Sequence, residues 1–163
     1  MNDLAALLQE NPVFSALGAD DRELMIQQAR RHTYSRDETI TLYGDVWSYL
    51  FLVGEGKVEA LKESSDGRSL HVTCFGKGEL FWGLSFFHED APMPVTLHAR
   101  EKSVLYLWAK DSVLPIILRN GGVSWEISRL MADRMQRASD LVEGLAFQPV
   151  AGRLARLLLD HFE

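Results

Sequence analysis

The side chains that could bind a metal or a haem iron are few. His88 and His98 flank an aromatic stretch, and either imidazole is suited to axial ligation of haem, with Met93 between them as a second ligand. A lone histidine near a turn is also commonly a surface residue, so both interpretations stay open here. The sequence has no His-x-His pair with a following glutamate, no Gly-x-Ser-x-Gly turn, no Walker loop and no clustered carboxylate pair. We therefore predict that the protein is not an enzyme.

Cys74 is the single cysteine of the chain. One thiol excludes an internal disulfide, a four-cysteine zinc site and a four-cysteine iron–sulfur cluster. Cys74 lies in an apolar run, which favours an inert core position over a redox or nitrosation sensor. A reducing compartment fits this cysteine usage, and we expect a cytoplasmic protein.

The charge balance limits the partners that the chain can bind by itself. Its 163 residues carry 17 Lys and Arg against 23 Asp and Glu, which gives a formal net charge of -6. Domains that grip nucleic acid by its phosphates usually have a basic surplus, so this chain is a poor DNA binder alone. It also lacks an apolar run of about 18 residues, the length that a membrane-spanning helix requires. We therefore expect no membrane partner.

The middle of the chain reads as a β domain. Residues 32–109 hold strand-like runs separated by glycine-rich turns, such as the alternating run 57–62 followed by Asp66-Gly67. Short helices are expected before it, over residues 2–31, where apolar residues recur at helical spacing. Regular short strands with such turns predict an all-β sandwich or barrel.

The last part of the chain, residues 110–163, is expected to be helical. From Val123 to Glu143 there is no glycine or proline, and Pro149 ends the helical pattern. Apolar residues recur there at alternating spacings of four and three, with Arg134 as the one interruption. The predicted dimerisation residues are Ile127, Met131, Ala138, Leu141, Val142 and Leu145. Such a seam favours a second copy of the same helix and hence a homodimer, while packing on the chain's own β domain is the alternative.

Several short motifs follow one another in an order typical of a known family. They are Phe14-Ser15-Ala16-Leu17, Gly44-Asp45, residues 50–58, Asp66-Gly67-Arg68, residues 76–81, Leu145-Ala146-Phe147 and residues 150–155. In this order and spacing, over essentially all 163 residues, the chain resembles the Crp/Fnr family of bacterial transcription regulators. The resemblance implies a mainly β fold with flanking helices: a double-stranded β-helix, or jelly roll, of the cyclic-nucleotide-binding kind, followed by a long dimerisation helix.

The resemblance also implies a division of the chain into three parts. Residues 1–122 would form the sensor domain with its N-terminal helices, and residues 123–147 the dimerisation helix. Residues 148–163 would form a hinge and the first helix of a truncated winged-helix domain. The hinge residues are Phe147, Gln148 and Pro149. We expect DNA to be bound through a C-terminal domain that is missing from this chain.

Relatives that bind cyclic nucleotides hold the ribose phosphate with a glutamate, an arginine and a hydroxyl in one cassette. Alignment on residues 78–81 places Gly83 at the glutamate, Met93 at the arginine and Pro94 at the hydroxyl position. A phosphate taken from water without its arginine costs several kcal/mol, and the missing acceptor adds about 1–3 kcal/mol. The sequence therefore argues against cAMP or cGMP in the usual pose, and Arg100 is the one nearby arginine that could replace the missing one.

An apolar cavity that suits a hydrophobic small molecule or haem is what remains of this pocket. The run Pro92-Met93-Pro94-Val95-Thr96 resembles a branch of the family that responds to nitrogen oxides and is partly haem-linked. The predicted pocket residues are Phe81, Trp82, Gly83, Leu84, Ser85, Met93, Pro94, Val95, Thr96, Arg134 and Ser139. The alternative is that the apolar members fill the core of the roll and that Ser139 lies on a solvated helix face.

The sequence thus predicts the effector-sensing and dimerisation portion of a Crp/Fnr-type transcription regulator. A small-molecule effector in the roll would shift the dimer helix and, through the hinge, the DNA-binding domains. A stand-alone ligand-binding or scaffolding protein without a DNA role is the alternative, and a metal-dependent cupin-type enzyme receives almost no support.

Overall fold

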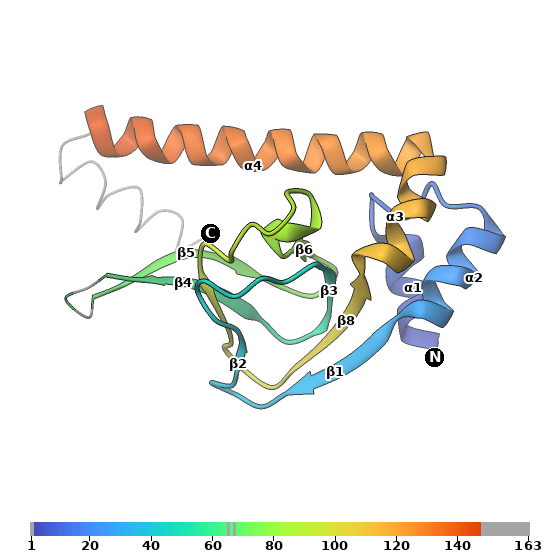
Figure 1. The fold of residues 1–163 in the computed structure, drawn as a ribbon, viewed down its shortest axis with the longest axis horizontal. Coiled ribbons are helices and arrows are strands. Elements are labelled where there is room, and N and C mark those ends of the chain that lie inside the picture. The colour runs from blue at the N-terminus through green and yellow to red at the C-terminus, as the bar shows by residue number, and fades with distance from the viewer. Residues whose placement is uncertain (1, 65, 67, 148–163) are drawn as a thin grey trace. The chain divides into compact units, whose positions relative to one another are not determined.

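The computed structural model describes residues 2–64, 66 and 68–147, without the side chains of Asn2 and Leu145. It divides into two compact units, one up to Val123 and one from Ser124 on. Figure 1 shows the order of the elements along the chain. They are α1 (Asn2–Glu10), α2 (Ala19–Gln28), β1 (Arg30–Tyr34), β2 (Thr39–Thr41), β3 (Tyr49–Glu55), β4 (Val58–Glu63), β5 (Ser69–Phe75), β6 (Leu80–Trp82), the 3-10 turn η1 (Leu84–Phe86), β7 (Thr96–Ala99), β8 (Ser103–Ala109), α3 (Lys110–Arg119) and α4 (Gly121–Phe147).

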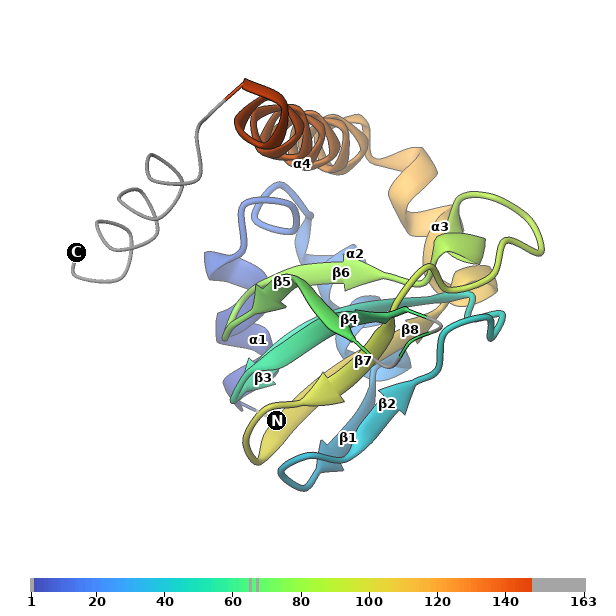
Figure 2. The same ribbon diagram turned by 90° about the vertical axis from the view of Figure 1, so that its left-hand side faces the viewer.

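The eight described strands form two four-stranded antiparallel sheets (Figure 2). Their strand orders are β1-β8-β3-β6 and β2-β7-β4-β5. Neighbours in these sheets are far apart in sequence, as in the pairing of β1 with β8, which is typical of a roll rather than of a simple meander. The expected jelly-roll domain followed by a long helix is confirmed.

The inward-facing side chains of both sheets make the core of the roll. Alternate residues of β3, Phe51 and Val53, point inward from one sheet, and Val58 and Ala60 of β4 do so from the other. Leu97, Leu105 and the other cluster members are at most 5% exposed. The core therefore lies between the two sheets.

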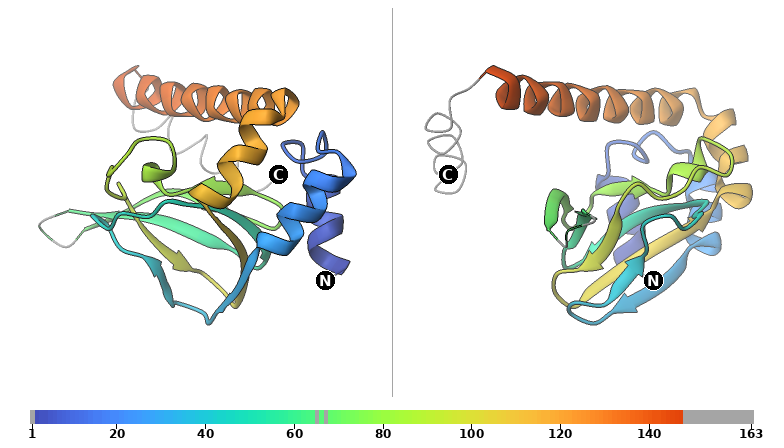
Figure 3. Two further views of the ribbon diagram at one scale, coloured as in Figure 1. Left: turned by 45° about the vertical axis from the view of Figure 1, so that its right-hand side comes forward. Right: turned by 60° about the vertical axis from the view of Figure 1, so that its left-hand side comes forward.

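The opposite face of the sheet β1-β8-β3-β6 packs against the short helices (Figure 3). Trp108, which is fully buried, donates its indole N–H to the carbonyl of Met25 in α2 over 2.7 Å and lies 6.0 Å from the ring of Phe14. Arg119 at the end of α3 pairs with Asp21 in the first turn of α2. The N-terminal helices thus cover an apolar face that the sheet would otherwise expose to water.

Helix α4 begins at Gly121, two residues before the expected start, and reaches Phe147. Within its own unit, the seam residues Leu141 and Val142 are 62% and 64% exposed. The hinge residues Gln148 and Pro149, the rest of 148–163 and the turn residue Gly67 lie outside the described residues, as does the side chain of Leu145. In the described part of the chain, each helix is too short or too polar to cross a membrane.

The prediction of a core position for Cys74 is wrong. Its strand, β5, is the edge strand of its sheet, and the thiol is exposed on the face directed away from the roll core. Partial burial nevertheless raises the pKa of the Cys74 thiol, although the positive charges of Arg100 and Lys57 act against that shift. Partial burial thus disfavours the thiolate, which is the nucleophilic form.

Candidate functional site

The cassette region runs from β6 through η1 and the loop 87–95 into β7, and it lies against the loop between β2 and β3. Two backbone hydrogen bonds join them: the N–H of Gly44 donates to the carbonyl of Met93 over 2.9 Å, and the N–H of Met93 donates to the carbonyl of Asp45 over 2.8 Å. The hydroxyls of Ser48 and Ser85 lie 2.9 Å apart. These contacts hold Ser85 and Met93 of the cassette against the loop 42–48.

Gly83 stands where the resemblance places the ribose-binding glutamate, and the structure leaves no room for a side chain there. A Cβ atom on Gly83 would lie 1.8 Å from the carbonyl oxygen of Trp47 and 2.9 Å from its Cβ. The backbone of Gly83 has φ -68° and ψ 142°, which any residue can adopt, so the reason for glycine is steric. The N–H of Gly83 donates to the carbonyl of Tyr49, which holds the two segments together.

Met93 stands at the position of the phosphate-binding arginine. Its side chain is buried in the core of the roll, packed with the inward-facing residues of both sheets. A charged guanidinium at this place would lose its hydration, which is why an apolar side chain suits it. Pro94 is exposed and has no backbone N–H that could bind an anion.

Arg100, the nearby arginine that could have replaced the missing one, is directed elsewhere. Its guanidinium lies 3.4 Å from Glu59 Oε2, and His71 Nδ1 lies 3.2 Å from the same oxygen. Glu59 is opposite His98 and Cys74 on β7 and β5, on the face of the sheet that points away from the core. Arg100 therefore has a carboxylate partner outside the roll.

The aromatic residues of the predicted pocket are divided between two faces. Phe81 points into the roll, where its ring stacks between Phe51 at 4.7 Å and Phe75 at 4.6 Å, both nearly parallel to it. Trp82 is opposite Leu50 on the other face of the sheet and makes an edge-on contact with Phe87 at 5.3 Å. Adjacent residues of one strand point to opposite sides, so the structure does not bring these two rings together.

The remaining predicted residues of this region have structural contacts. Val95 packs on the roll core, and the hydroxyl of Thr96 accepts a hydrogen bond from the N–H of Tyr43 over 3.0 Å. Leu84 is exposed, and Ser85 is buried with its hydroxyl on Ser48. Phe81 and Met93 therefore agree with the alternative that these apolar residues fill the core.

The histidines considered for haem do not share a face with Met93. His98 alternates with the inward-facing Leu97 and Ala99, and its Nδ1 lies 3.3 Å from the hydroxyl of Thr39 outside the roll. His88 is exposed just after η1. Among the described residues, no group of three or more His, Cys, Asp or Glu side chains is placed to hold a metal ion. The fold separates His98 from Met93, so these two residues do not make an axial pair.

Comparison with known proteins decides the family. The model of the cyclic nucleotide-binding domain matches residues 31–120, which is more than half of the chain. The chain belongs to the cyclic nucleotide-binding domain family. Its curated relatives include the "Cyclic AMP receptor protein" of Thermus thermophilus, 26% identical over 152 residues, which cover 93% of this chain and 70% of that protein. The "cAMP-activated global transcriptional regulator Vfr" of Pseudomonas aeruginosa is 26% identical over 139 residues, covering 83% of this chain and 65% of its own length. The resemblance to Crp-type regulators is thus confirmed.

Solved structures give the same fold. The crystal structure of the Thermus thermophilus catabolite activator protein matches with a TM-score of 0.72 and 26% identity, covering 83% of this chain and 63% of that one. The sensor domain of the transcriptional regulator DNR from Pseudomonas aeruginosa matches with a TM-score of 0.72 and 13% identity, covering 89% of this chain and 93% of that domain. The second likeness concerns the fold alone. This cyclic nucleotide-binding domain thus spans about two thirds of the length of its curated relatives.

Two residues of α4, Arg134 and Ser139, were predicted to reach a ligand. They belong to the second compact unit, which begins at Ser124. Ser139 is exposed, and Arg134 is partly exposed. On the same helix, the carboxylate of Glu126 lies 3.1 Å from the guanidinium of Arg129. The part of Arg134 and Ser139 in ligand binding stays a prediction.

Sequence reasoning missed the residue that shapes this site most, Trp47. Its carbonyl fills the space beside Gly83, and its ring packs against Tyr49 and Phe51 at 5.5 and 6.2 Å. A loop residue 36 positions before Gly83 gives no local signal of that contact. The glycine itself was the one available sign, because a glycine in an extended strand end often marks a close backbone approach.

Proposed function

We propose that the chain is the sensory and dimerisation part of a Crp-type DNA-binding transcription regulator, and that its roll does not take a cyclic nucleotide in the family's pose. The supporting observation is the contact between Gly83 and the Trp47 carbonyl, since it denies a side chain to the position that receives the ribose in cyclic-nucleotide-binding relatives. The burial of Met93 in the roll core and the pairing of Arg100 with Glu59 support it further.

The proposal assigns the effector to the apolar class. Met93 is apolar and Arg100 pairs with Glu59, so neither of these two positions offers a cation that would offset the lost hydration of a bound phosphate. An uncharged apolar effector has no such requirement. The predicted homodimer through α4 and the DNA-binding domain beyond this chain belong to the same proposal.

A binding experiment tests the cyclic-nucleotide part. Isothermal titration of the full chain with cAMP and with cGMP should show no saturable binding up to about 1 mM, since the two lost contacts are together expected to weaken binding by more than about 1,000-fold. The Thermus thermophilus cyclic AMP receptor protein is the control, titrated under the same conditions. Stoichiometric micromolar binding to this chain would overturn the proposal.

The haem interpretation is tested in the same preparation. Protein purified from haem-supplied cells should have a flat visible spectrum, with and without nitric oxide. A Soret band at one haem per chain that moves with the gas would replace the apolar effector by haem, and His88→Ala and His98→Ala would then identify the ligand.

A further inference from the structure

The two loops that meet at Gly83 and Met93 also expose apolar side chains. We call these residues the loop-end patch: Leu42, Tyr43, Val46, Leu84 and Phe87, each 40% to 62% exposed. The hydrogen bonds from Gly44 to Met93 and from Tyr43 to Thr96 hold the two loops side by side. Apolar side chains exposed on two adjoining loops favour an interaction site.

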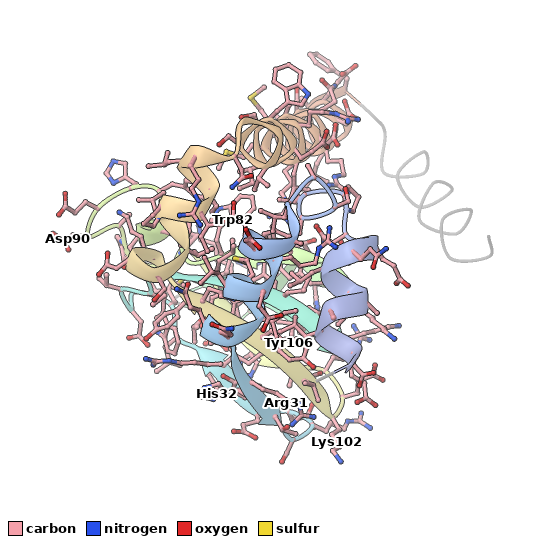
Figure 4. All side chains as sticks on the ribbon, turned by 90° about the vertical axis from the view of Figure 1, so that its right-hand side faces the viewer. Arg31, His32, Trp82, Asp90, Lys102 and Tyr106 are labelled. Carbon is pink, nitrogen blue, oxygen red and sulfur yellow. The ribbon has the colours of Figure 1, made fainter. Side chains whose placement is uncertain are left out.

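The formally charged side chains that the two loops themselves carry are acidic. Residues 37–56 and 78–99 contain no lysine or arginine. Asp45, Glu89 and Asp90 are exposed beside the patch, and Asp90 lies at the outer end of its loop (Figure 4). Within the described residues, no ion pair reaches any of these three carboxylates. Lys110 adjoins this region, where its backbone N–H donates to the carbonyl of Ser48.

This charge selects the kind of partner. A nucleotide, a nucleic acid or an anionic lipid surface would be repelled by three carboxylates that have no ion-pair partner among the described residues. A second copy that presented the same patch would place like charges opposite each other, which is also unfavourable. A segment with lysine or arginine beside an apolar face matches both the apolar and the acidic part of the surface.

We propose that the loop-end patch docks a basic amphipathic segment of a partner protein. The partner's apolar side chains cover Tyr43, Val46 and Phe87, and its cations pair with Glu89 and Asp90. This inference uses the outer surface of the loops and does not depend on which effector the roll binds. It would hold even if the proposed sensor function were wrong.

A model peptide tests the proposal on the full chain. The probe is a fluorescently labelled helix of about 18 residues with leucine on one face and lysine on the other. The control peptide is the same helix with glutamate in place of lysine. Fluorescence anisotropy should show saturable binding of the lysine peptide and none of the glutamate peptide. Binding should weaken as salt rises from low to physiological ionic strength, since the ion pairs are exposed.

Matched variants separate docking from general attraction to an acidic protein. Glu89→Gln with Asp90→Asn removes two charges from the patch, and asparagine tolerates the positive φ of 54° at position 90. Glu10→Gln with Glu63→Gln removes two exposed charges elsewhere. The patch variant should lose at least about fivefold in affinity and the control less than about twofold. Val46→Ser with Phe87→Ser should lose a similar factor.

Three results would overturn the proposal. Equal losses in the patch and control variants would mean general charge attraction. Equal binding of the lysine and glutamate peptides would mean that the patch is merely apolar. Concentration-dependent self-association that the Val46→Ser, Phe87→Ser variant abolishes would assign the patch to a second copy of this chain.

Discussion

The roll buries large apolar side chains on both faces of one sheet, whereas helix α4 exposes several of them. The roll has buried tryptophan, phenylalanine and leucine on both faces of the sheet β1-β8-β3-β6, one inside the roll and one under the short helices. Helix α4 has Trp125, Met135, Leu141 and Val142 exposed by 62% to 72%. The roll therefore completes its core within one chain, whereas α4 has an apolar surface that a second helix can cover.

The largest expected difference is in the free energy of unfolding after substitution of two tryptophans, Trp108 in the roll and Trp125 in α4. Trp108→Ala should lower the free energy of unfolding by about 3–5 kcal/mol, because it removes a fully buried ring and its hydrogen bond to Met25. Trp125→Ala should change it by less than about 0.5 kcal/mol, because that ring is 66% exposed. Urea unfolding followed by circular dichroism measures both. If Trp108→Ala yields no soluble protein, Trp108→Phe should lose about 1–2 kcal/mol through the missing donor. Similar losses for the two tryptophans would contradict the comparison.

Charged substitutions on the apolar surface of α4 should weaken the homodimer rather than unfold the chain. We expect Leu141→Glu with Val142→Glu to weaken the homodimer by at least about 100-fold, because two buried charges would face the partner helix. Light scattering coupled to size-exclusion chromatography over a concentration series measures the effect. Ala132→Glu, on the opposite side of α4, is the control and should leave the dimer intact. If the parent chain is monomeric at every concentration, the proposed dimerisation through this surface is wrong.

Adding a single methyl group at Gly83 should show how closely the roll is packed there. Gly83→Ala should lower the free energy of unfolding by about 1–3 kcal/mol, because its Cβ would overlap the Trp47 carbonyl. Gly18→Ala adds the same group where no atom lies within 4 Å, at a backbone φ of -63°. Gly18 is the N-cap of α2, where glycine is preferred to alanine, so the loss should stay below about 1 kcal/mol. Equal unfolding midpoints in urea for the two variants would show that the contact at Gly83 yields easily.

The smallest expected effect on stability comes from the ion pair between Asp21 of α2 and Arg119 of α3. Hydrogen bonds from Arg119 and Asn120 hold the pKa of Asp21 below its ordinary value. A lowered folded-state pKa means that the contribution to stability is present above the unfolded pKa and is lost as pH falls through the folded one. The difference in urea midpoint between the parent and Arg119→Gln should thus be seen near neutral pH and shrink below about pH 4. Arg129→Gln, on α4, should leave the midpoint of the roll unchanged at both pH values.

The sequence was sufficient for the elements with strong patterns. The glycine-bounded runs at 49–53 and 70–75 became β3 and β5, and the uninterrupted heptad-like run became α4. Strand β1 carries the polar segment Arg30–Tyr34, whose side chains are mostly exposed. It has no alternation of apolar residues and is a strand only because β8 pairs with it over five residues. Pairing with a distant strand leaves no trace in the local pattern.

The candidate site was only partly predictable for a related reason. The substitutions at Gly83 and Met93 were visible in the sequence, and the argument against a bound cyclic nucleotide that rests on them stays a prediction. That Phe81 and Trp82 point to opposite faces also follows from strand alternation, but β6 has only three residues and gave no separate strand signal. The placement of Arg100 beside Glu59 depends on the pairing of β4 with β7, which no local rule gives.

The contact between Gly83 and Trp47 also restricts the substitutions that this domain can accept. A single substitution that returns a glutamate to position 83 would collide with a backbone carbonyl and destabilise the roll before any ribose could be bound. The loop 42–48 would have to move first, yet that loop is fastened to the cassette through Met93 and Ser85, so its displacement alone would also be harmful. A nucleotide-binding cassette could therefore be built in this domain only by changing position 83 and the loop 42–48 together.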